Sequence, residues 1–200
     1  MRILIVGASG DVGTAARQAL EARHEIIAAG RNSGDVKVDL MDPASIRAMF
    51  AKLGRVDAIV ATAGHSHFGP LVKMTEKDFR KGLDDKLMGQ INLVLAGLDH
   101  VNDGGSITLT TGVLDRDPVR GGANAAAVNG AISAFVRSAS LEMPRGIRIN
   151  AVSPALLEAS VERYKGAFPG HLPVSSARAG LAYVKSVEGA LNGQIIVADA

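Results

Sequence analysis

Short apolar runs alternate with longer segments of helical periodicity from one end of the chain to the other. The apolar runs predict buried strands at Arg2–Val6, Glu25–Ala29, Val36–Val38, Val56–Thr62, Ser106–Thr110, Arg148–Val152 and Gln194–Ala198. The periodic segments predict helices at Thr14–Ala22, Pro43–Leu53, Thr75 to about Val101, Gly122–Met143 and Ser176–Glu188. Strands that alternate with helices form βαβ units. We therefore expect an α/β fold, a doubly wound parallel sheet of about seven strands with helices on both faces.

Helix-start and helix-stop signals support several of these boundaries. Asp42 precedes Pro43 as an N-cap, and Thr75 with Asp78 forms a capping pattern. Gly89 and Gly97 interrupt the long third helix, and residues 154–175 contain three prolines and read as irregular. The chain has no linker, repeat or low-complexity segment, so we expect one domain over residues 1–200.

Composition narrows the class of protein without naming a function. The chain is 47% hydrophobic and 21% charged, and it contains no Cys or Trp. The net charge of +2 and the absence of long Lys/Arg runs argue against a nucleic-acid partner. The longest apolar stretches, such as Asn92–Leu98, are too short to cross a membrane. The chain has no cysteine, so no disulfide pattern ties it to an oxidising compartment. We expect a cytoplasmic protein without a membrane partner.

A glycine series follows the first predicted strand and leads into a helix. A dinucleotide pyrophosphate needs a tight turn, close approach to the backbone and free N–H groups at a helix N-terminus, and this arrangement supplies all three. The series therefore predicts a Rossmann-type cofactor site, although an ordinary glycine-rich turn is the alternative. The expected cofactor-binding residues of this turn are Gly7, Ser9, Gly10, Asp11, Val12 and Gly13.

The end of the second predicted strand indicates which dinucleotide is preferred. NAD sites commonly place an acidic residue here for the ribose hydroxyls, whereas this chain has Arg31, Asn32 and Ser33. A guanidinium group suits a 2′-phosphate. We predict NADP, with NADPH preferred over NADH; a solvated loop arginine is the alternative.

Five further segments, in order, resemble those of the short-chain dehydrogenase/reductase family, and the resemblance covers essentially the whole chain. They are Val38–Leu40, Ala61–Gly64, Gly105–Gly112, Arg148–Pro154 and Asn192–Val197. The resemblance implies that Asp39 and Leu40 contact the adenine, that Ala63 and Gly64 line the cofactor, and that Pro154 lies beside the nicotinamide. One departure is that Asp11 stands in the glycine turn where the family usually has a second glycine.

The family's proton-donating pair is the larger departure. The resemblance places a Tyr-x-x-x-Lys pair at Ala125 and Asn129, so neither residue type is retained. It places Thr111 at the position of the catalytic serine and Lys86 at that of the helix asparagine. The expected catalytic residues are therefore Thr111, Lys86 and Asn129. Reduction of a carbonyl builds charge on oxygen, which an acid or a cation must neutralise.

Other side chains are candidates for the missing acid. His65 and His67 follow the fourth strand, and Tyr164 lies in the irregular segment, whereas Tyr183 reads as a packing residue. The scattered histidines predict no metal site.

Three functions remain open at this point. The first is an NADP(H)-dependent oxidoreductase acting on a small carbonyl or alcohol through an atypical site. The second is a catalytically inactive NADP(H)-binding protein with a sensing or regulatory role. The third is a scaffold that binds no nucleotide. The resemblance also implies a homodimer or homotetramer, for which Ala131–Val136 offers small and apolar residues.

Overall fold

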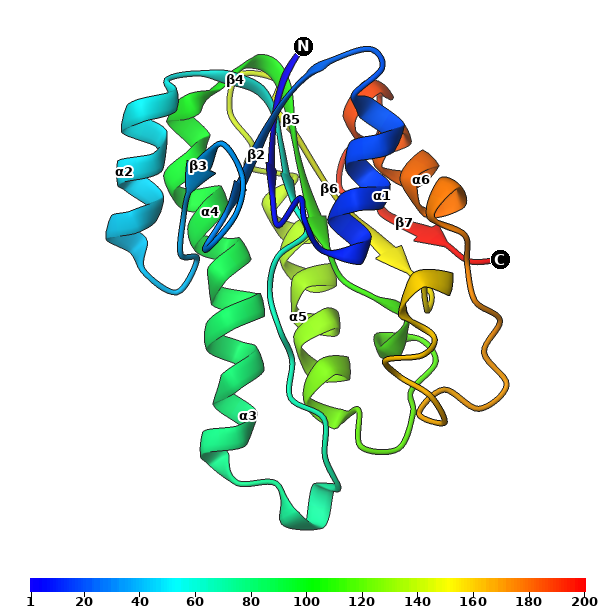
Figure 1. Cartoon of the computed structure of the whole chain (residues 1–200). Coiled ribbons are helices and arrows are strands. Elements are labelled where there is room, and N and C mark those ends of the chain that lie inside the picture. Colours follow the sequence, from blue (N-terminus) through cyan, green and yellow to red (C-terminus); the bar gives the residue numbers. More distant parts are fainter.

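Seven strands form one parallel sheet in the order β3-β2-β1-β4-β5-β6-β7 in a computed structural model that describes residues 1–200 (Figure 1). The strands are β1 Arg2–Val6, β2 Glu25–Gly30, β3 Val36–Lys37, β4 Val56–Ala61, β5 Val101–Thr110, β6 Arg148–Pro154 and β7 Ile195–Ala198. The order reverses direction between β1 and β4. In open α/β sheets, ligands bind at the carboxyl ends of the strands beside such a reversal.

Helices cover both faces of this sheet, as the alternation of side chains along β1 shows. Leu4 and Val6 enter the core that lies under α2, α4 and α5, whereas Ile3 and Ile5 enter the core under α1 and α6. The helices are α1 Asp11–Leu20, α2 Pro43–Leu53, α3 Glu76–Gly82, α4 Gly89–Gly97, α5 Ala123–Ala139 and α6 Ser176–Glu188. Strands buried on both faces read as continuous apolar runs. The predicted Rossmann-type fold is confirmed.

The long helix predicted from Thr75 is divided. Between α3 and α4 the chain forms a π-helical segment, Leu83–Met88, and a 3₁₀ turn follows α4. Glycines on either side of the π segment allow close packing: a Cβ on Gly82 would lie 2.1 Å from Asn124 Oδ1, and one on Gly89 would lie 3.0 Å from Leu40 Cβ. The wider π turn includes Lys86, which bonds across to the end of β5 and to α5. Such turns are frequent at functional sites.

Several other boundaries differ by a few residues from the expected ones; α5, for example, ends at Ala139 instead of Met143. Strand β5 begins at Val101 instead of Ser106, because the polar Asn-Asp-Gly-Gly run that reads as a turn is accommodated by a shift in register against β4. Helix α1 begins at Asp11, directly after the glycine turn, instead of at Thr14. This earlier start brings the helix N-terminus to the predicted phosphate site.

Candidate active site

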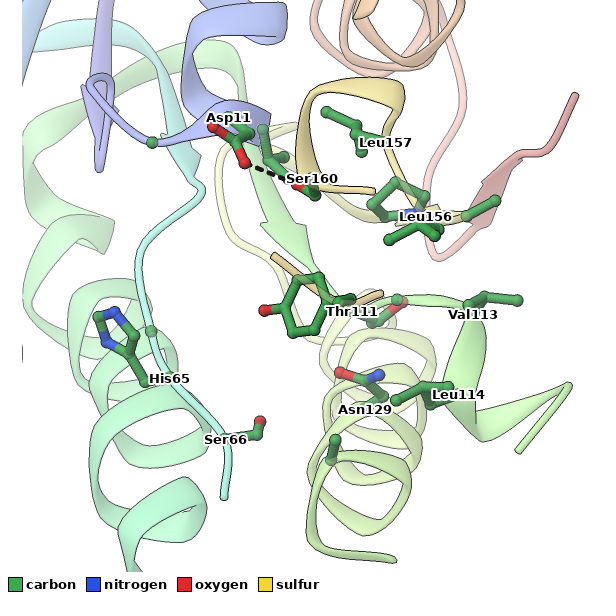
Figure 2. Close-up of a pocket in the computed structure, with 18 of the residues that line it drawn as sticks. Asp11, His65, Ser66, Thr111, Val113, Leu114, Asn129, Leu156, Leu157 and Ser160 are labelled. Carbon is green, nitrogen blue, oxygen red and sulfur yellow. Dashed lines mark hydrogen bonds between the residues drawn. The ribbon is translucent and has the colours of Figure 1, made fainter. Parts of the chain in front are cut away.

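A cavity of about 320 Å³ opens at the carboxyl ends of β1, β4, β5 and β6 (Figure 2). Its walls come from the glycine turn, the segment after β4, the π segment, the start of α5 and the irregular segment after β6. Figure 2 shows Asp11 and Ser160 at one end, and Thr111, Asn129 and Leu114 toward the other. The predicted residues that line it are Gly10, Asp11, Val12, Gly64, Lys86, Thr111, Asn129 and Pro154.

The glycine turn has the geometry that a pyrophosphate requires. Gly7 has a φ of +91°, and a Cβ there would lie 2.6 Å from the backbone nitrogen of Ala63, so a side chain does not fit. The first helical hydrogen bond runs from Thr14 N–H to Gly10 O. The N–H groups of the three preceding residues therefore have no partner inside the helix. The cavity reaches this turn, so these residues fit a bound diphosphate.

The residues predicted for the adenosine end form a neighbouring polar group outside this cavity. Ser9 Oγ and Ser33 Oγ are 3.0 Å apart, which joins the glycine turn to the loop after β2. Arg31 Nη2 lies 3.4 Å from Asp39 Oδ1, and the Arg31 side chain is 54% exposed. Leu40 is buried. The guanidinium group therefore remains accessible to a ligand.

Lys86 forms the charged floor of the cavity. Its Nζ donates hydrogen bonds to Thr111 O at 2.7 Å and to Asn129 Oδ1 at 2.8 Å. Burial of the ammonium group lowers the pKa of Lys86 to about 8, and the charge of Asp115 opposes this shift. The Thr111 hydroxyl is buried and makes only a long contact, 3.4 Å, to Val152 O. The fold thus unites the three predicted catalytic residues.

Comparison with known proteins identifies the family. A family model described as enoyl-(acyl carrier protein) reductase matches residues 9–188. The chain belongs to the short-chain dehydrogenase/reductase family. Members of this family are in general NAD(P)-dependent oxidoreductases.

Individual relatives support this assignment. A hydroxynaphthalene reductase of Aspergillus fumigatus is 28% identical over 76% of this chain and 57% of its own length. The chain spans little more than half the length of the first curated relatives it matches. The solved protein lin1944 from Listeria innocua is 49% identical, with a TM-score of 0.97 and 98% of each chain covered. A small-chain dehydrogenase crystallised with NADPH is 26% identical, with a TM-score of 0.87, and the match covers 100% of this chain and 96% of that one.

Within this dehydrogenase/reductase frame, the two positions aligned with the Tyr-x-x-x-Lys pair both line the cavity. Ala125 presents a methyl group there, and Asn129 holds the Lys86 ammonium. The alignment that assigns these positions to the pair stays a prediction.

The other candidate acids differ in their placement. His65 pairs with Asp85 at 3.2 Å, and its side chain is 87% exposed at the cavity rim. His67 does not line the cavity. Tyr164 does, and its ring lies between those of Phe68 and Phe168. Tyr183 is fully buried beside Thr110, where burial raises its pKa well above the usual value.

Two polar residues at the phosphate end of the cavity were not predicted from the sequence. Ser160 and Arg163 lie in the irregular segment after β6, and both reach Asp11 across the glycine turn. No periodicity or motif marks them, so the sequence carries no signal for this contact.

Two further findings concern metals and membranes. Nowhere in the chain do three His, Asp or Glu side chains gather in a way that would hold a metal ion. No helix combines the length and apolar character needed to cross a bilayer.

Proposed function

We propose that this protein is an NADP(H)-dependent oxidoreductase that interconverts a small carbonyl compound and its alcohol. The supporting observation is a single cavity that joins the glycine turn to the buried ammonium of Lys86. When bound, NADPH supplies the hydride that the carbonyl carbon accepts. All other parts of the reaction are assigned to side chains of this chain.

Cofactor binding is assigned to two groups of residues. The pyrophosphate is assigned to the turn of Gly7, Ser9, Gly10, Asp11, Val12 and Gly13. The adenosine and its 2′-phosphate are assigned to Arg31, Asn32, Ser33, Asp39 and Leu40, and the nicotinamide end to Ala63, Gly64 and Pro154. The exposed guanidinium of Arg31 supports NADP over NAD, since it can form a bidentate pair with the 2′-phosphate.

Lys86 is proposed as the proton donor in place of a Tyr-x-x-x-Lys pair that is absent at Ala125 and Asn129. An ammonium group has three N–H bonds, and two are occupied by Thr111 O and Asn129 Oδ1. The third is available to the carbonyl oxygen. Lys86 gives that oxygen a proton as the hydride reaches the carbon, and it regains a proton from water. A pKa of about 8 suits proton transfer near neutral pH.

Thr111 and Asn129 position this ammonium group. Asn129 accepts one of its hydrogen bonds through the side chain, and Thr111 accepts another through the backbone carbonyl. Because these two acceptor oxygens are already in place, the Lys86 ammonium group needs no reorganisation to donate to the substrate during the reaction.

A catalytically inactive NADP(H)-binding protein is the second candidate. The methyl group of Ala125 in the cavity wall favours it, because no acid stands at that point. Both candidates require NADPH binding, and only the first requires turnover.

Cofactor binding is tested by titrating the protein with NADPH and following the dinucleotide's fluorescence. We expect saturable binding, and Arg31→Gln should weaken NADPH about ten- to a hundredfold while leaving NADH unchanged. Equal losses for NADPH and NADH would contradict the assignment of Arg31 to the 2′-phosphate.

Catalysis is tested with a panel of ketones, aldehydes and quinones in the presence of NADPH. The Lys86→Ala variant should lose about a hundredfold or more of the rate at unchanged NADPH affinity. Lys81→Ala is the matched control, because Lys81 is exposed and pairs with Asp78 outside the cavity. No turnover with any substrate, alongside normal NADPH binding, would favour the inactive binding protein.

We also propose a homodimer or homotetramer. In the run Ala131–Val136, Ile132, Ser133 and Val136 are buried in the chain's own interior, so only the remaining residues are available for pairing between copies. Light scattering during size-exclusion chromatography measures the oligomeric mass.

A further inference from the structure

One ion pair connects the phosphate end of the cavity to the irregular segment after β6. Asp11, the first residue of α1, accepts a hydrogen bond from Ser160 Oγ through Oδ2 at 2.6 Å, which Figure 2 marks with a dashed line. The same oxygen lies 3.2 Å from Arg163 Nη2. All three residues line the cavity. This contact therefore belongs to the wall of the cavity, although the proposed reaction makes no use of it.

The carboxylate of Asp11 is an unexpected group beside a phosphate site. A carboxylate at a helix N-terminus is itself favourable. A pyrophosphate at the same turn is also anionic, however, and two like charges at close range oppose each other. A cation between or beside them removes this conflict. The acidic and basic side chains that line the cavity are those of Asp11, His65, Lys86 and Arg163.

Of the three basic side chains among these four, Arg163 alone is placed for this task. The Lys86 ammonium is engaged by Thr111 and Asn129 on the floor of the cavity. His65 lies at the rim and pairs with Asp85. Arg163 is held at the glycine turn by Asp11, and 63% of its side chain is exposed, so its remaining N–H groups are free to meet an anion.

We propose that Arg163 is a cofactor-binding residue that pairs with the pyrophosphate, and that Asp11 and Ser160 are its positioning residues. This inference rests on the proposed NADP(H) site. Asp11 holds the guanidinium over the turn, and Ser160 fixes the carboxylate from the same segment. Arg163 in turn neutralises Asp11, so the turn accepts a diphosphate although it carries an acid. The segment after β6 thereby contributes to binding the cofactor as well as to covering the cavity.

A purely structural tie between the two segments predicts a different pattern of variants. If the ion pair only anchors residues 155–175, removal of either partner loosens the same segment, and both single variants weaken cofactor binding. The double variant is then no better than the Arg163 variant. If Arg163 also neutralises the carboxylate, Asp11→Asn in the Arg163→Gln background removes a repulsion of the pyrophosphate and recovers part of the lost affinity.

The experiment measures NADPH affinity by fluorescence titration for four proteins: the unmodified chain, Arg163→Gln, Asp11→Asn and the double variant. Arg163→Gln should weaken NADPH binding about ten- to a hundredfold. Adding Asp11→Asn should restore part of that affinity, because the uncompensated carboxylate is gone while the contact between Arg163 and the pyrophosphate stays lost. Asparagine keeps an oxygen that accepts from Ser160, so the local packing is preserved.

Two comparisons locate the effect. Adenosine 2′-monophosphate lacks the pyrophosphate, so its affinity should be unchanged by Arg163→Gln and lowered by Arg31→Gln. Lys165→Gln is the matched control, since Lys165 lies on the same segment, is 80% exposed and does not line the cavity. It removes the same charge and should leave NADPH affinity unchanged.

Each failure has a separate meaning. If the unmodified chain binds no NADPH, both the proposed function and this inference are wrong. If it binds NADPH and Arg163→Gln binds equally well, only this inference is wrong. A double variant as weak as Arg163→Gln, or a control as weak, also overturns it.

Discussion

Lys86 is a charged side chain that is buried at a cost in free energy, at a position to which we assign a catalytic role. An ammonium group is placed among protein atoms only where acceptors replace lost water, and here two oxygens do so. These two hydrogen bonds do not fully replace the lost hydration, since burial still lowers the pKa of Lys86 from 10.5 to about 8. The protonated form is therefore less favourable in the folded chain than in the unfolded chain. The free energy lost by burying this ammonium group is spent on a residue that lines the cavity.

This shift predicts a dependence of stability on pH. Between the folded and unfolded pKa values the unfolded chain binds more protons, so the free energy of unfolding should rise with pH from about 8 to about 10. A shift from 10.5 to about 8 corresponds to about 3 kcal/mol in full. The rise should be absent from Lys86→Met. Urea unfolding at a series of pH values measures it.

The control for this measurement is Lys81→Met, which removes an exposed lysine of the neighbouring α3 helix. It should keep the rise of the unmodified chain. Parallel curves for the unmodified chain and Lys86→Met would show that burial does not shift this pKa.

At the scale of elements, a buried asparagine joins α5 to two other segments. Asn124 has no exposed surface; its Nδ2 donates to Phe79 O at 2.6 Å in α3, and its Oδ1 accepts from His67 N–H at 2.8 Å. Gly82 makes room for this side chain. α3 and the start of α5 extend together beyond the sheet (Figure 1). The asparagine thereby ties α3 and the segment after β4 to the start of α5, next to Ala125 in the cavity wall.

Removing this side chain should destabilise the protein. Asn124→Ala removes the partner of two half-buried backbone groups, the His67 N–H and the Phe79 carbonyl, and leaves a cavity at a fully buried position, which predicts a loss of about 2 kcal/mol in the free energy of unfolding. Gln18→Ala on the exposed side of α1 should change it by less than about 0.5 kcal/mol. Chemical denaturation of the two variants gives the comparison, and a loss for Asn124→Ala no larger than the control's would contradict the assigned role.

At the scale of the whole molecule, α1 and α6 bring the beginning and the end of the chain together on one face of the sheet (Figure 1). Their packing depends on a glycine. A Cβ on Gly180 would lie 2.7 Å from Ala15 O and 2.8 Å from Ala19 Cβ. Backbone therefore meets backbone at this crossing.

A side chain at this crossing should separate the two helices. We expect Gly180→Val to lower the free energy of unfolding by about 2–3 kcal/mol, because overpacking forces the helices apart. Leu181→Val is the neighbouring control, since Leu181 is 58% exposed. Thermal unfolding of both variants distinguishes them; equal melting temperatures would show that the crossing tolerates a wider spacing.

The strands, the helices and the glycine turn were predictable because their signals are local. Apolar runs mark strands buried on both faces, and Asp42 and Thr75 mark helix starts by capping chemistry that acts within a few residues. The π segment was not predicted. The glycines on either side of it pack against Asn124 and Leu40, and contacts between residues so distant in the chain leave no local pattern. The extent of the domain and the cellular location remain predictions.

Apart from the division of the long helix, the sequence by itself determined the elements, their alternation and hence the doubly wound sheet, since each depends on neighbours along the chain. Only the tertiary structure decided how the site is assembled. It brings Lys86 to Asn129 and Thr111, and it brings Arg163 to Asp11. The physical reason is that burial, desolvation and ion pairing depend on which groups meet in space. No local pattern encodes the meeting of a helix N-terminus with a segment that follows the sixth strand.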